Sequence, residues 1–326
     1  MSGTVTVKGR TMSWDEAMAR AVRLERLSLV VLALAVALVA LVSGQSQAMK
    51  AAWVEDSLSL LPPLAFLLAA RRIRRRPDLE HPYGYHRAVG IGHLVAAVAL
   101  FTMGAYLLID SAMGLLMAER APIGLTVIAG HAVWAGWLMV AAMILTSIPA
   151  VLLGRAKMRL AEPLHDKVLF ADADMNRADW ASGLATVLGV LGIGIGWWWA
   201  DGAAAIFVSA GIIHDGVRNV RAAIGGLSDR RARTYDDRQV HPLVGDAEEV
   251  ALAEPWVAHA RARVRDQGHV LHAEVFTIPR PGDAPSLAQL VALRERIEGL
   301  DWKLGDVVVV PVEEYPQALR EAVDPA

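Results

Sequence analysis

Two carboxylates near the start of a long apolar segment could bind a metal ion or carry a proton. Asp172 and Asp179 are seven residues apart, so a helix would place both on one face, and Met175 and Asn176 lie between them. The segment that follows, 181–199, is apolar enough to cross a membrane. A carboxylate at the bilayer centre costs about 2.5–3.5 kcal/mol, so such residues usually serve an ion or a proton. The alternative is that these acids lie at the membrane surface and reach into water.

A second acidic pair, Glu55 and Asp56, lies within an earlier apolar segment. An unpaired acid there needs a partner, and the helix face that carries Asp172 and Asp179 is the obvious candidate. Oxygen ligands from two helices could together hold a divalent cation. The alternative is that these carboxylates carry protons or are held by hydrogen bonds.

The histidines provide further candidate ligands. The loop 77–87 gathers Asp78, His81 and His86, which suit zinc-like ions, although a solvated basic segment at the membrane surface is the alternative. His272 is a further candidate ligand, but His269 is three residues away on the same predicted strand and therefore on its opposite face. Three histidines that stand alone in apolar segments are interpreted as hydrogen-bonded to neighbouring helices: His93, His131 and His214.

The elements that must position these residues are mainly membrane helices. The chain has 326 residues, of which 55% are hydrophobic, and no cysteine, which excludes disulfides and thiolate metal sites. Six apolar segments are predicted to span the membrane: 27–42, 49–70, 88–117, 123–153, 170–199 and 202–227. Arg and Lys concentrate in 1–26, 71–87, 155–167 and 218–238, so both termini are predicted to be cytoplasmic. The arginine run 71–76 is explained by this topology and by lipid headgroups, not by nucleic acid.

The C-terminal part, 230–326, has the composition of a soluble domain. Helices are predicted at 247–254 and 287–300, the second with Ser286 as its N-cap. Strands are predicted at 257–264, 269–278 and 306–312. The order α-β-β-α-β predicts a small α+β, ferredoxin-like domain. The predicted organisation is therefore an N-terminal segment 1–26, a six-helix transmembrane domain 27–229 and the cytoplasmic domain 230–326.

These features together resemble the cation diffusion facilitator family of divalent-metal/proton antiporters. The family's second helix reads Asp-Ser-Leu, as do residues 56–58, and its fifth reads Ala-Asp-x-x-His-x-x-x-Asp, which residues 171–179 match except that Met175 replaces the His. The family's loop signature His-Pro-Phe-Gly-His-x-Arg resembles residues 81–87. The resemblance implies a homodimer of six-helix protomers that exchanges a metal ion for protons, without a resident cofactor. No nucleophile–base pair is found, so an enzyme is not expected.

The departures from the family concern the ligands. The family's tetrahedral transport site takes two ligands from each of two helices, but only Asp56 and Asp179 remain at matching positions, with Leu60 and Met175 at the other two. Leucine cannot ligate, and a thioether suits Cu(I) better than Zn²⁺. A shift of one residue would let Asn176 and Asp172 complete an all-oxygen shell, which favours Mn²⁺, Mg²⁺ or Fe²⁺ over zinc. The alternative is a relative that no longer transports zinc-type ions and serves assembly or regulation.

The loop and the C-terminal domain depart from the family as well. Tyr85 replaces the second histidine of the loop, with His86 adjacent, and Leu290-Val291 stand where the family has Ala-His. We therefore expect a metal-poor C-terminal domain that serves mainly for dimerisation. The chain is predicted to be a bacterial inner-membrane exporter of a divalent cation (Mn, Fe, Zn, Co or Mg), driven by inward proton flow.

Overall fold

The computed structural model describes residues 4–7, 10–73, 75, 77–120, 122–128, 130–268 and 270–321. The chain forms two compact units. The helical unit comprises Met18–Ala161 and Val168–Ile224. The sheet unit comprises Met1–Ala17, Glu162–Lys167 and Gly225–Ala326.

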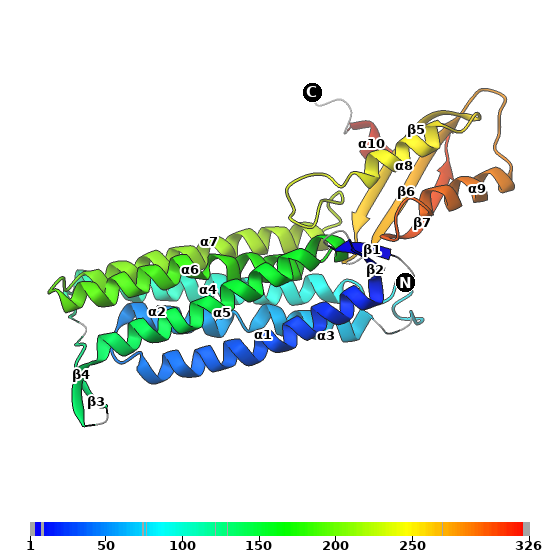
Figure 1. Cartoon of the computed structure of the whole chain (residues 1–326). Helices are drawn as coiled ribbons and strands as arrows, with labels where there is room; N and C mark the ends of the chain where they lie inside the picture. The colour runs from blue at the N-terminus through cyan, green and yellow to red at the C-terminus, as the bar shows by residue number, and fades with distance from the viewer. Residues whose placement is uncertain are drawn as a thin grey trace. The chain divides into compact units, whose positions relative to one another are not determined.

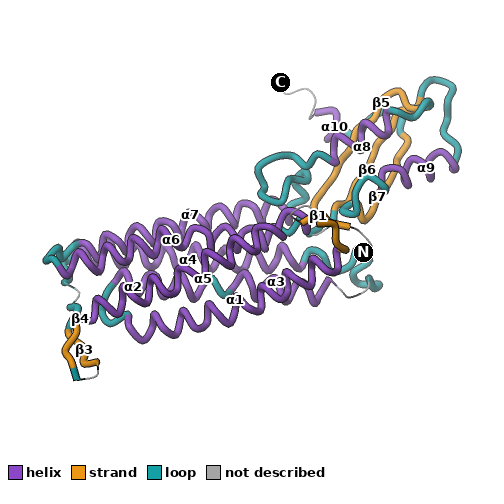
Figure 2. The backbone as a smooth tube through the Cα atoms, in the orientation of Figure 1, coloured by secondary structure: helices purple, strands orange, loops and turns teal. Residues whose placement is uncertain are grey.

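Long helices that share a common direction make up the helical unit (Figure 1; Figure 2). Their bounds are α1 Trp14–Val42, α2 Gln47–Leu58, α3 Leu61–Ile73, α4 Ala88–Leu116, α5 Ala135–Leu164, α6 Lys167–Gly194 and α7 Ala200–Leu227. Among the described residues, four segments are long and apolar enough to cross a membrane: Trp14–Val42, Gln47–Arg72, Ala88–Leu116 and Ala135–Leu164. The helices α6 and α7 have 28 residues each but carry more polar side chains.

The second membrane segment is broken between α2 and α3. Pro62 and Pro63 lack the N–H groups that would bond to the carbonyls of Leu58 and Ser59, so the helix cannot continue unchanged through this point. The Ser59 amide donates to the Glu55 carbonyl at 2.9 Å and closes the last turn of α2. The break therefore follows directly after the acidic pair of this segment.

The predicted span 123–153 is wrong in its first part. A hairpin of β3 Leu125–Ile128 and β4 His131–Trp134 precedes α5, and Gly130 between the strands has a φ of +83° that favours glycine. A short apolar run fits a hairpin as well as a helix, which is why periodicity did not separate them. His131 consequently lies exposed on a strand rather than within a membrane helix.

Close approaches fix α7 against its neighbours. A Cβ at Gly216 would lie 2.6 Å from the backbone nitrogen of Phe101, so the absence of a side chain allows α7 and α4 to touch. In its first turn, Asp201 accepts hydrogen bonds from Ser46 Oγ and from the Gln47 amide, both at 2.5 Å. An α7 carboxylate therefore caps the positive end of α2, the helix that carries Glu55.

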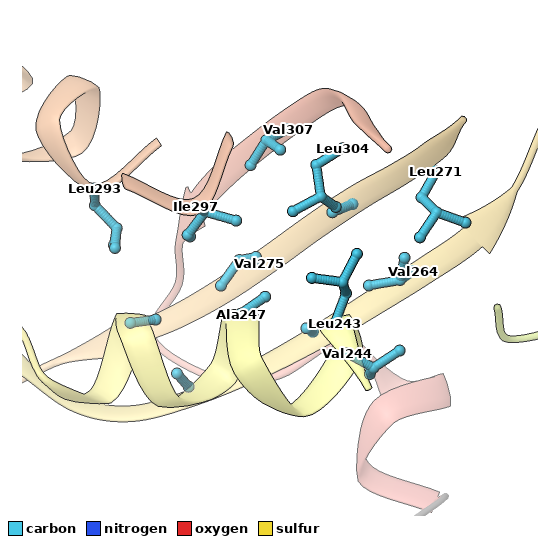
Figure 3. Close-up of a cluster of buried hydrophobic side chains, with 14 of the residues drawn as sticks. Leu243, Val244, Ala247, Val264, Leu271, Val275, Leu293, Ile297, Leu304 and Val307 are labelled. Carbon is cyan, nitrogen blue, oxygen red and sulfur yellow. The ribbon is translucent and has the colours of Figure 1, made fainter. Parts of the chain in front are cut away.

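The sheet unit contains a three-stranded sheet with two helices packed on one face (Figure 3). The strands β5 Val257–Asp266 and β6 Leu271–Pro279 pair antiparallel, and β6 pairs parallel with β7 Leu304–Pro311. The helices α8 Leu243–Leu252 and α9 Leu287–Glu298 bury Ala247, Leu293 and Ile297 against the strands. The predicted order α-β-β-α-β is confirmed, and a capping box of Ser286 and Gln289 confirms the predicted N-cap.

Two further elements of this unit lie near the chain termini. The hairpin of β1 Thr4–Val7 and β2 Arg10–Ser13 precedes α1 and was not predicted from the sequence. A short helix, α10 Gln317–Glu321, follows β7.

Candidate functional site

Three acidic side chains from three helices line a cavity of about 240 Å³ in the helical unit. Glu55 comes from α2, Asp179 from α6 and Asp215 from α7. Ser182, one turn after Asp179, donates its hydroxyl to Glu55 Oε1 at 2.9 Å and so links α6 to α2. None of the described residues that line the cavity is basic.

Asp56 lies close enough to Asp179 for the two carboxylates to interact electrostatically. The Asp179 carboxylate interacts electrostatically with Glu55, Asp56, Asp172 and Asp215. Because Asp172 also pairs with Lys157, we call the other four residues, Glu55, Asp56, Asp179 and Asp215, the acidic cluster. Asp56 Oδ2 is buried and has no hydrogen-bond partner among the described residues. A buried carboxylate oxygen without a donor is energetically costly, which makes it a candidate to accept a cation or a proton.

Met175 lies at the edge of this cluster. Its side chain is 6% exposed, lines the cavity and packs in an apolar group that includes Leu58 and Leu100. The thioether is thus placed where the family has a histidine ligand. Leu60, at the remaining family position, is not among the described residues that line the cavity.

Asp172 and Asn176 belong to a different group, although they share α6 with Asp179. Lys157 of α5 forms ion pairs with Asp172 and with Glu25 of α1, the latter at 3.0 Å. Asn176 Nδ2 donates to Asp172 Oδ1 at 3.0 Å. Each of these four side chains, which we call the Lys157 cluster, is at most 2% exposed. The structure thus pairs Asp172 with Lys157 and Asn176 with Asp172, while the Asp172 charge also acts on Asp179. The oxygen-shell hypothesis, in which Asp172 and Asn176 join Asp56 and Asp179, stays a prediction.

Sequence reasoning missed three of these residues. Asp215 is an acid within an apolar segment, so the rule that identified Glu55 would also have found it. Lys157 was counted with the basic loop 155–167, and Glu25 with the N-terminal segment. No spacing within either segment indicates that their side chains meet.

Arg218 of α7 lies beside the acidic cluster. Its guanidinium is 2.8 Å from Asp174 Oδ2 and 3.6 Å from Asp215 Oδ1. The Arg218 side chain is 43% exposed, so solvent weakens its electrostatic interaction with Asp215. Asp174 therefore has a fixed cationic partner, as Asp172 does.

In the loop between α3 and α4, hydrogen bonds occupy the candidate ligand Asp78. Tyr85 donates its hydroxyl to Asp78 Oδ2 at 2.6 Å, and the His81 amide donates to Oδ1 at 2.7 Å. The hydrogen bond from Tyr85, followed by that from the His81 amide, lowers the pKa of the Asp78 carboxyl to about 2. Tyr85, which replaces the family's second histidine, thus uses the oxygen that a metal would need. His86 is half-buried nearby.

The remaining histidines have partners within the protein or lie at the surface. His272 of β6 places Nδ1 2.8 Å from Asp306 Oδ2 and Nε2 3.4 Å from Glu274 Oε1, so the two carboxylates lie on opposite sides of the ring. His93 Nε2 lies 3.3 Å from Asn219 Oδ1 of α7, which confirms its interpretation as a bonded intramembrane histidine. His214 is exposed, and His269 lies outside the described residues.

Among the residues that the structure describes, no three His, Asp or Glu side chains converge closely enough to hold a metal ion. The acidic cluster is therefore a set of carboxylates around a cavity rather than a closed coordination shell.

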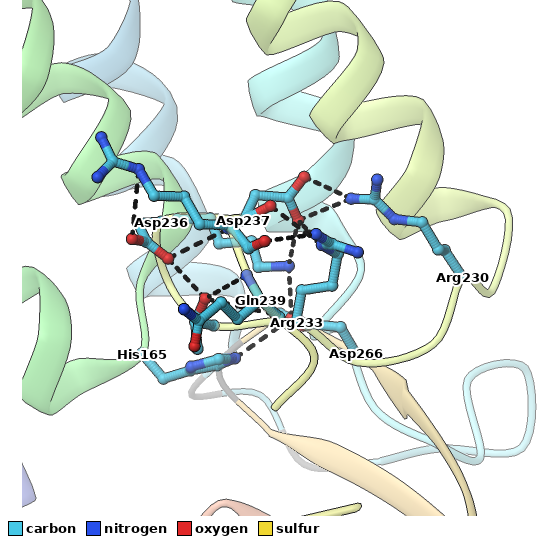
Figure 4. A network of polar contacts seen from close by, with 11 residues as sticks. His165, Arg230, Arg233, Asp236, Asp237, Gln239 and Asp266 are labelled. Atoms are coloured by element: carbon cyan, nitrogen blue, oxygen red, sulfur yellow. Dashed lines mark hydrogen bonds and ion pairs between the residues drawn. The ribbon is translucent and has the colours of Figure 1, made fainter. Parts of the chain in front are cut away.

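A polar network in the sheet unit holds the corner between α5 and α6 (Figure 4). Lys167 Nζ lies 3.0 Å from Asp266 Oδ2 and 3.5 Å from Asp237 Oδ1, and Arg230 also bonds Asp237. Burial alone would raise the pKa of Asp266, but the hydrogen bond with His165 and the charge of Lys167 outweigh it and lower the pKa to about 2.

His241 adjoins this network, with its ring centroid 5.1 Å from that of His165. Burial, together with the positive charges of His165 and Lys303, lowers the pKa of His241 to about 4. The histidine is therefore neutral at physiological pH.

Several long apolar helices with buried acids between them are typical of a multi-pass membrane protein that binds or transports ions. A model of the cation efflux transmembrane domain matches residues 26–228. The chain therefore belongs to the cation efflux family, as its resemblance to cation diffusion facilitators predicted, and is a multi-pass membrane protein.

Two proteins of Bacillus subtilis (strain 168) are similar to this chain. The manganese efflux system protein MneS is 23% identical over 163 residues, which cover 50% of this chain and 52% of MneS. The manganese efflux system protein MneP is 20% identical over 233 residues, which cover 69% of this chain and 72% of MneP. The match thus spans about half the length of MneS and more of MneP.

Proposed function

We propose that this protein exports a divalent metal cation through the helical unit, with the acidic cluster as the transport site and protons as the exchanged ions. The observation that carries the proposal is the cavity lined by Glu55, Asp179 and Asp215 without a basic side chain among its described lining residues. Carboxylates from three helices leave a negative charge that a divalent cation or protons can balance.

The cation is proposed to be one that prefers oxygen ligands. Asp56, Asp179, Glu55 and Asp215 supply carboxylates, and Met175 supplies one soft thioether at the edge. Carboxylates suit Mn²⁺ and Mg²⁺, and Fe²⁺ is also accommodated, whereas zinc and cobalt are better served by imidazole or thiolate. The manganese efflux named for the two relatives supports Mn²⁺ as the first ion to test.

Proton exchange follows from the chemistry of the ligands. A carboxylate must lose its proton before it binds a metal ion, so binding the ion releases protons and protonation releases the ion. If the bundle alternates between two open states, the acidic cluster then moves metal in one direction and protons in the other. Asp56, whose Oδ2 has no donor among the described residues, is the proposed first acceptor.

The number of membrane spans and their orientation are proposed from the helices and the basic loops. Together with α1, α2–α3, α4 and α5, the helices α6 and α7 would give six spans, and the basic loops would place both termini in the cytoplasm. We propose boundaries at residues 26 and 229, a ferredoxin-like C-terminal domain that forms a homodimer, and location in the inner membrane of a bacterium. No enzymatic activity is proposed.

Proteoliposomes that contain the purified protein and an internal pH-sensitive dye test this function. We expect saturable flux of one ion among Mn²⁺, Fe²⁺, Mg²⁺, Co²⁺ and Zn²⁺, with opposing proton movement. Asp56→Asn and Asp179→Asn should each lower the flux about hundredfold, because each substitution removes a carboxylate that binds the ion and the proton in every transport cycle. Asp110→Asn makes the same chemical change on α4 away from the cavity and should leave the flux unchanged.

Two outcomes would contradict the proposal. Unchanged flux in the folded Asp179→Asn variant would remove the acidic cluster from the transport path. No flux above empty liposomes for any of the five ions would favour a member of the family that assembles or regulates without transporting, as Leu60 at a ligand position would then indicate.

A further inference from the structure

A second cavity, of about 420 Å³, lies between the end of α3, the loop that follows it and the start of α4. Its floor is apolar: Leu68 of α3 is 64% exposed and Ile91 of α4 is 56% exposed. At the base, a Cβ on Gly92 would lie 3.1 Å from the Ala65 Cβ, so the two helices touch there. The cavity is thus a trough of exposed apolar side chains closed at the bottom by helix packing.

The other end of the trough is cationic. Arg72, Arg87 and His81 line the cavity, and none of the described lining residues is an acid. The Arg72 guanidinium lies 5.3 Å from the centroid of the Tyr85 ring, and Tyr85 is itself held by its hydrogen bond to Asp78. Asp78, which does not itself line the cavity, thereby orders the loop through Tyr85.

The trough lies where two candidate membrane-spanning segments end, which places it at a membrane surface. Its apolar floor belongs to Gln47–Arg72 and Ala88–Leu116, both segments that can span a membrane, and its arginines stand where those segments end. Lipid phosphates lie at that level, and acyl chains lie beside the apolar part of the same helices. A guanidinium binds a phosphate through two parallel N–H groups, which a point charge cannot do.

We propose that this trough binds an anionic phospholipid, with its phosphate between Arg72 and Arg87 and one acyl chain along Leu68 and Ile91. Two arginines, with no acid among the described residues of the lining, favour a headgroup of net negative charge over a zwitterionic one, because the latter brings its own cation. The site is separate from the acidic cluster, so it stands or falls independently of the proposed transport function.

Native mass spectrometry of the full-length protein, purified in detergent and mixed with equal amounts of phosphatidylglycerol and phosphatidylcholine, tests this site. We expect retention of phosphatidylglycerol over phosphatidylcholine by about tenfold, as two charge-assisted contacts allow. The double substitution Arg72→Gln and Arg87→Gln should abolish this preference. Arg71→Gln removes the neighbouring charge on α3 without touching the cavity lining and should leave the preference unchanged.

The contributions of the phosphate and of the acyl chain to binding can be measured separately. Leu68→Ser should lower retention of phosphatidylglycerol and leave any binding of soluble glycerol phosphate unchanged, because only the acyl contact is altered. Thermal unfolding of each variant checks that it remains folded. Equal retention of the two lipids by the unaltered protein would overturn the proposal. An equal loss in Arg71→Gln, or competition by glycerol phosphate as strong as that by the intact lipid, would overturn it as well.

Discussion

The Lys157 cluster and the acidic cluster are both groups of buried carboxylates within the helical unit, and they differ in their cations. In the Lys157 cluster, the ammonium of Lys157 lies between Glu25 and Asp172, and Asn176 adds a hydrogen bond. In the acidic cluster, the described lining of the cavity offers no basic side chain, and Arg218 reaches Asp215 only at 3.6 Å from a partly exposed position.

On the proposed function, this difference distinguishes structural acids from acids that exchange a proton or an ion. A buried carboxylate needs a compensating charge, and a covalently attached ammonium supplies it permanently. Where the protein supplies none, the charge must come from a proton or from an ion that can leave again. We therefore propose different roles for Asp172 and Asp179, although both are aspartates of α6, seven residues apart.

Removal of the built-in cation is the strongest test of this contrast. Lys157→Met leaves Glu25 and Asp172 buried without their partner, and we expect a loss of about 3–5 kcal/mol in the free energy of unfolding. Denaturant unfolding in detergent measures it. The triple variant with Glu25→Gln, Lys157→Met and Asp172→Asn, which removes all three charges, should recover most of the loss. A single Lys157→Met variant as stable as the unaltered protein would contradict a structural role for this cluster.

Glu55, which the sequence named only as one of an acidic pair, and Asp215, which sequence reasoning missed, test the other half of the contrast. Glu55→Gln and Asp215→Asn should each lower metal flux about hundredfold, equivalent to about 2.7 kcal/mol. Because Glu55 has no cationic partner among the described residues and Asp215 has only the partly exposed Arg218, neutralising them should leave the free energy of unfolding unchanged or increase it. Flux in proteoliposomes and unfolding in detergent give the two readings. Destabilisation by more than about 1 kcal/mol with normal flux would place these residues with the structural acids.

The Asp266 network extends the contrast to an acid with built-in cations outside the helical unit. Because the pKa of Asp266 is lowered to about 2, its contribution is fully present above the unfolded value of about 3.9 and is lost as the pH falls through 2. Asp266→Asn should therefore cost about 2 kcal/mol at pH 7 and much less near pH 2. Thermal unfolding between pH 7 and pH 2.5 measures the difference. A deficit that stays constant with pH would show that Asp266 acts through packing and not through its charge.

The smallest expected effect concerns the choice of ion. Met175→His places an imidazole at the edge of the acidic cluster, and imidazole suits zinc better than manganese. We expect the ratio of zinc to manganese flux to rise about tenfold, or about 1.4 kcal/mol in relative barrier. Met175→Leu, which keeps the volume but removes the sulfur, is the matched control. An unchanged ratio in the histidine variant would place residue 175 outside the coordination of the ion.

Much of the fold could be predicted from the order of apolar segments and loops. The order of the C-terminal elements and the Ser286 cap followed from alternation and capping patterns, which are local properties of the chain. The hairpin before α5 was missed because the apolar run that contains it reads equally well as a helix. The break after Leu58 was foreseeable from Pro62 and Pro63, which remove backbone donors wherever they stand.

The candidate site could be predicted only in part. Asp56 and Asp179 were named from their motifs, and the structure brings their charges together. Asp172 and Asn176 were assigned to the same site from a shared helix face and a one-residue shift of the family motif. Both arguments state which residues share a face but not which neighbour that face meets.

The sequence by itself determined the family, the apolar segments and the presence of costly carboxylates within them, because composition and local pattern are sufficient for these. Only the tertiary structure decided which carboxylate has a cation of its own. Lys157 and Asp172 are 15 residues apart and meet because α5 and α6 pack together, with Glu25 brought in by α1. Coulomb attraction acts over a few ångströms in space, and the packing of helices, not spacing along the chain, sets those distances.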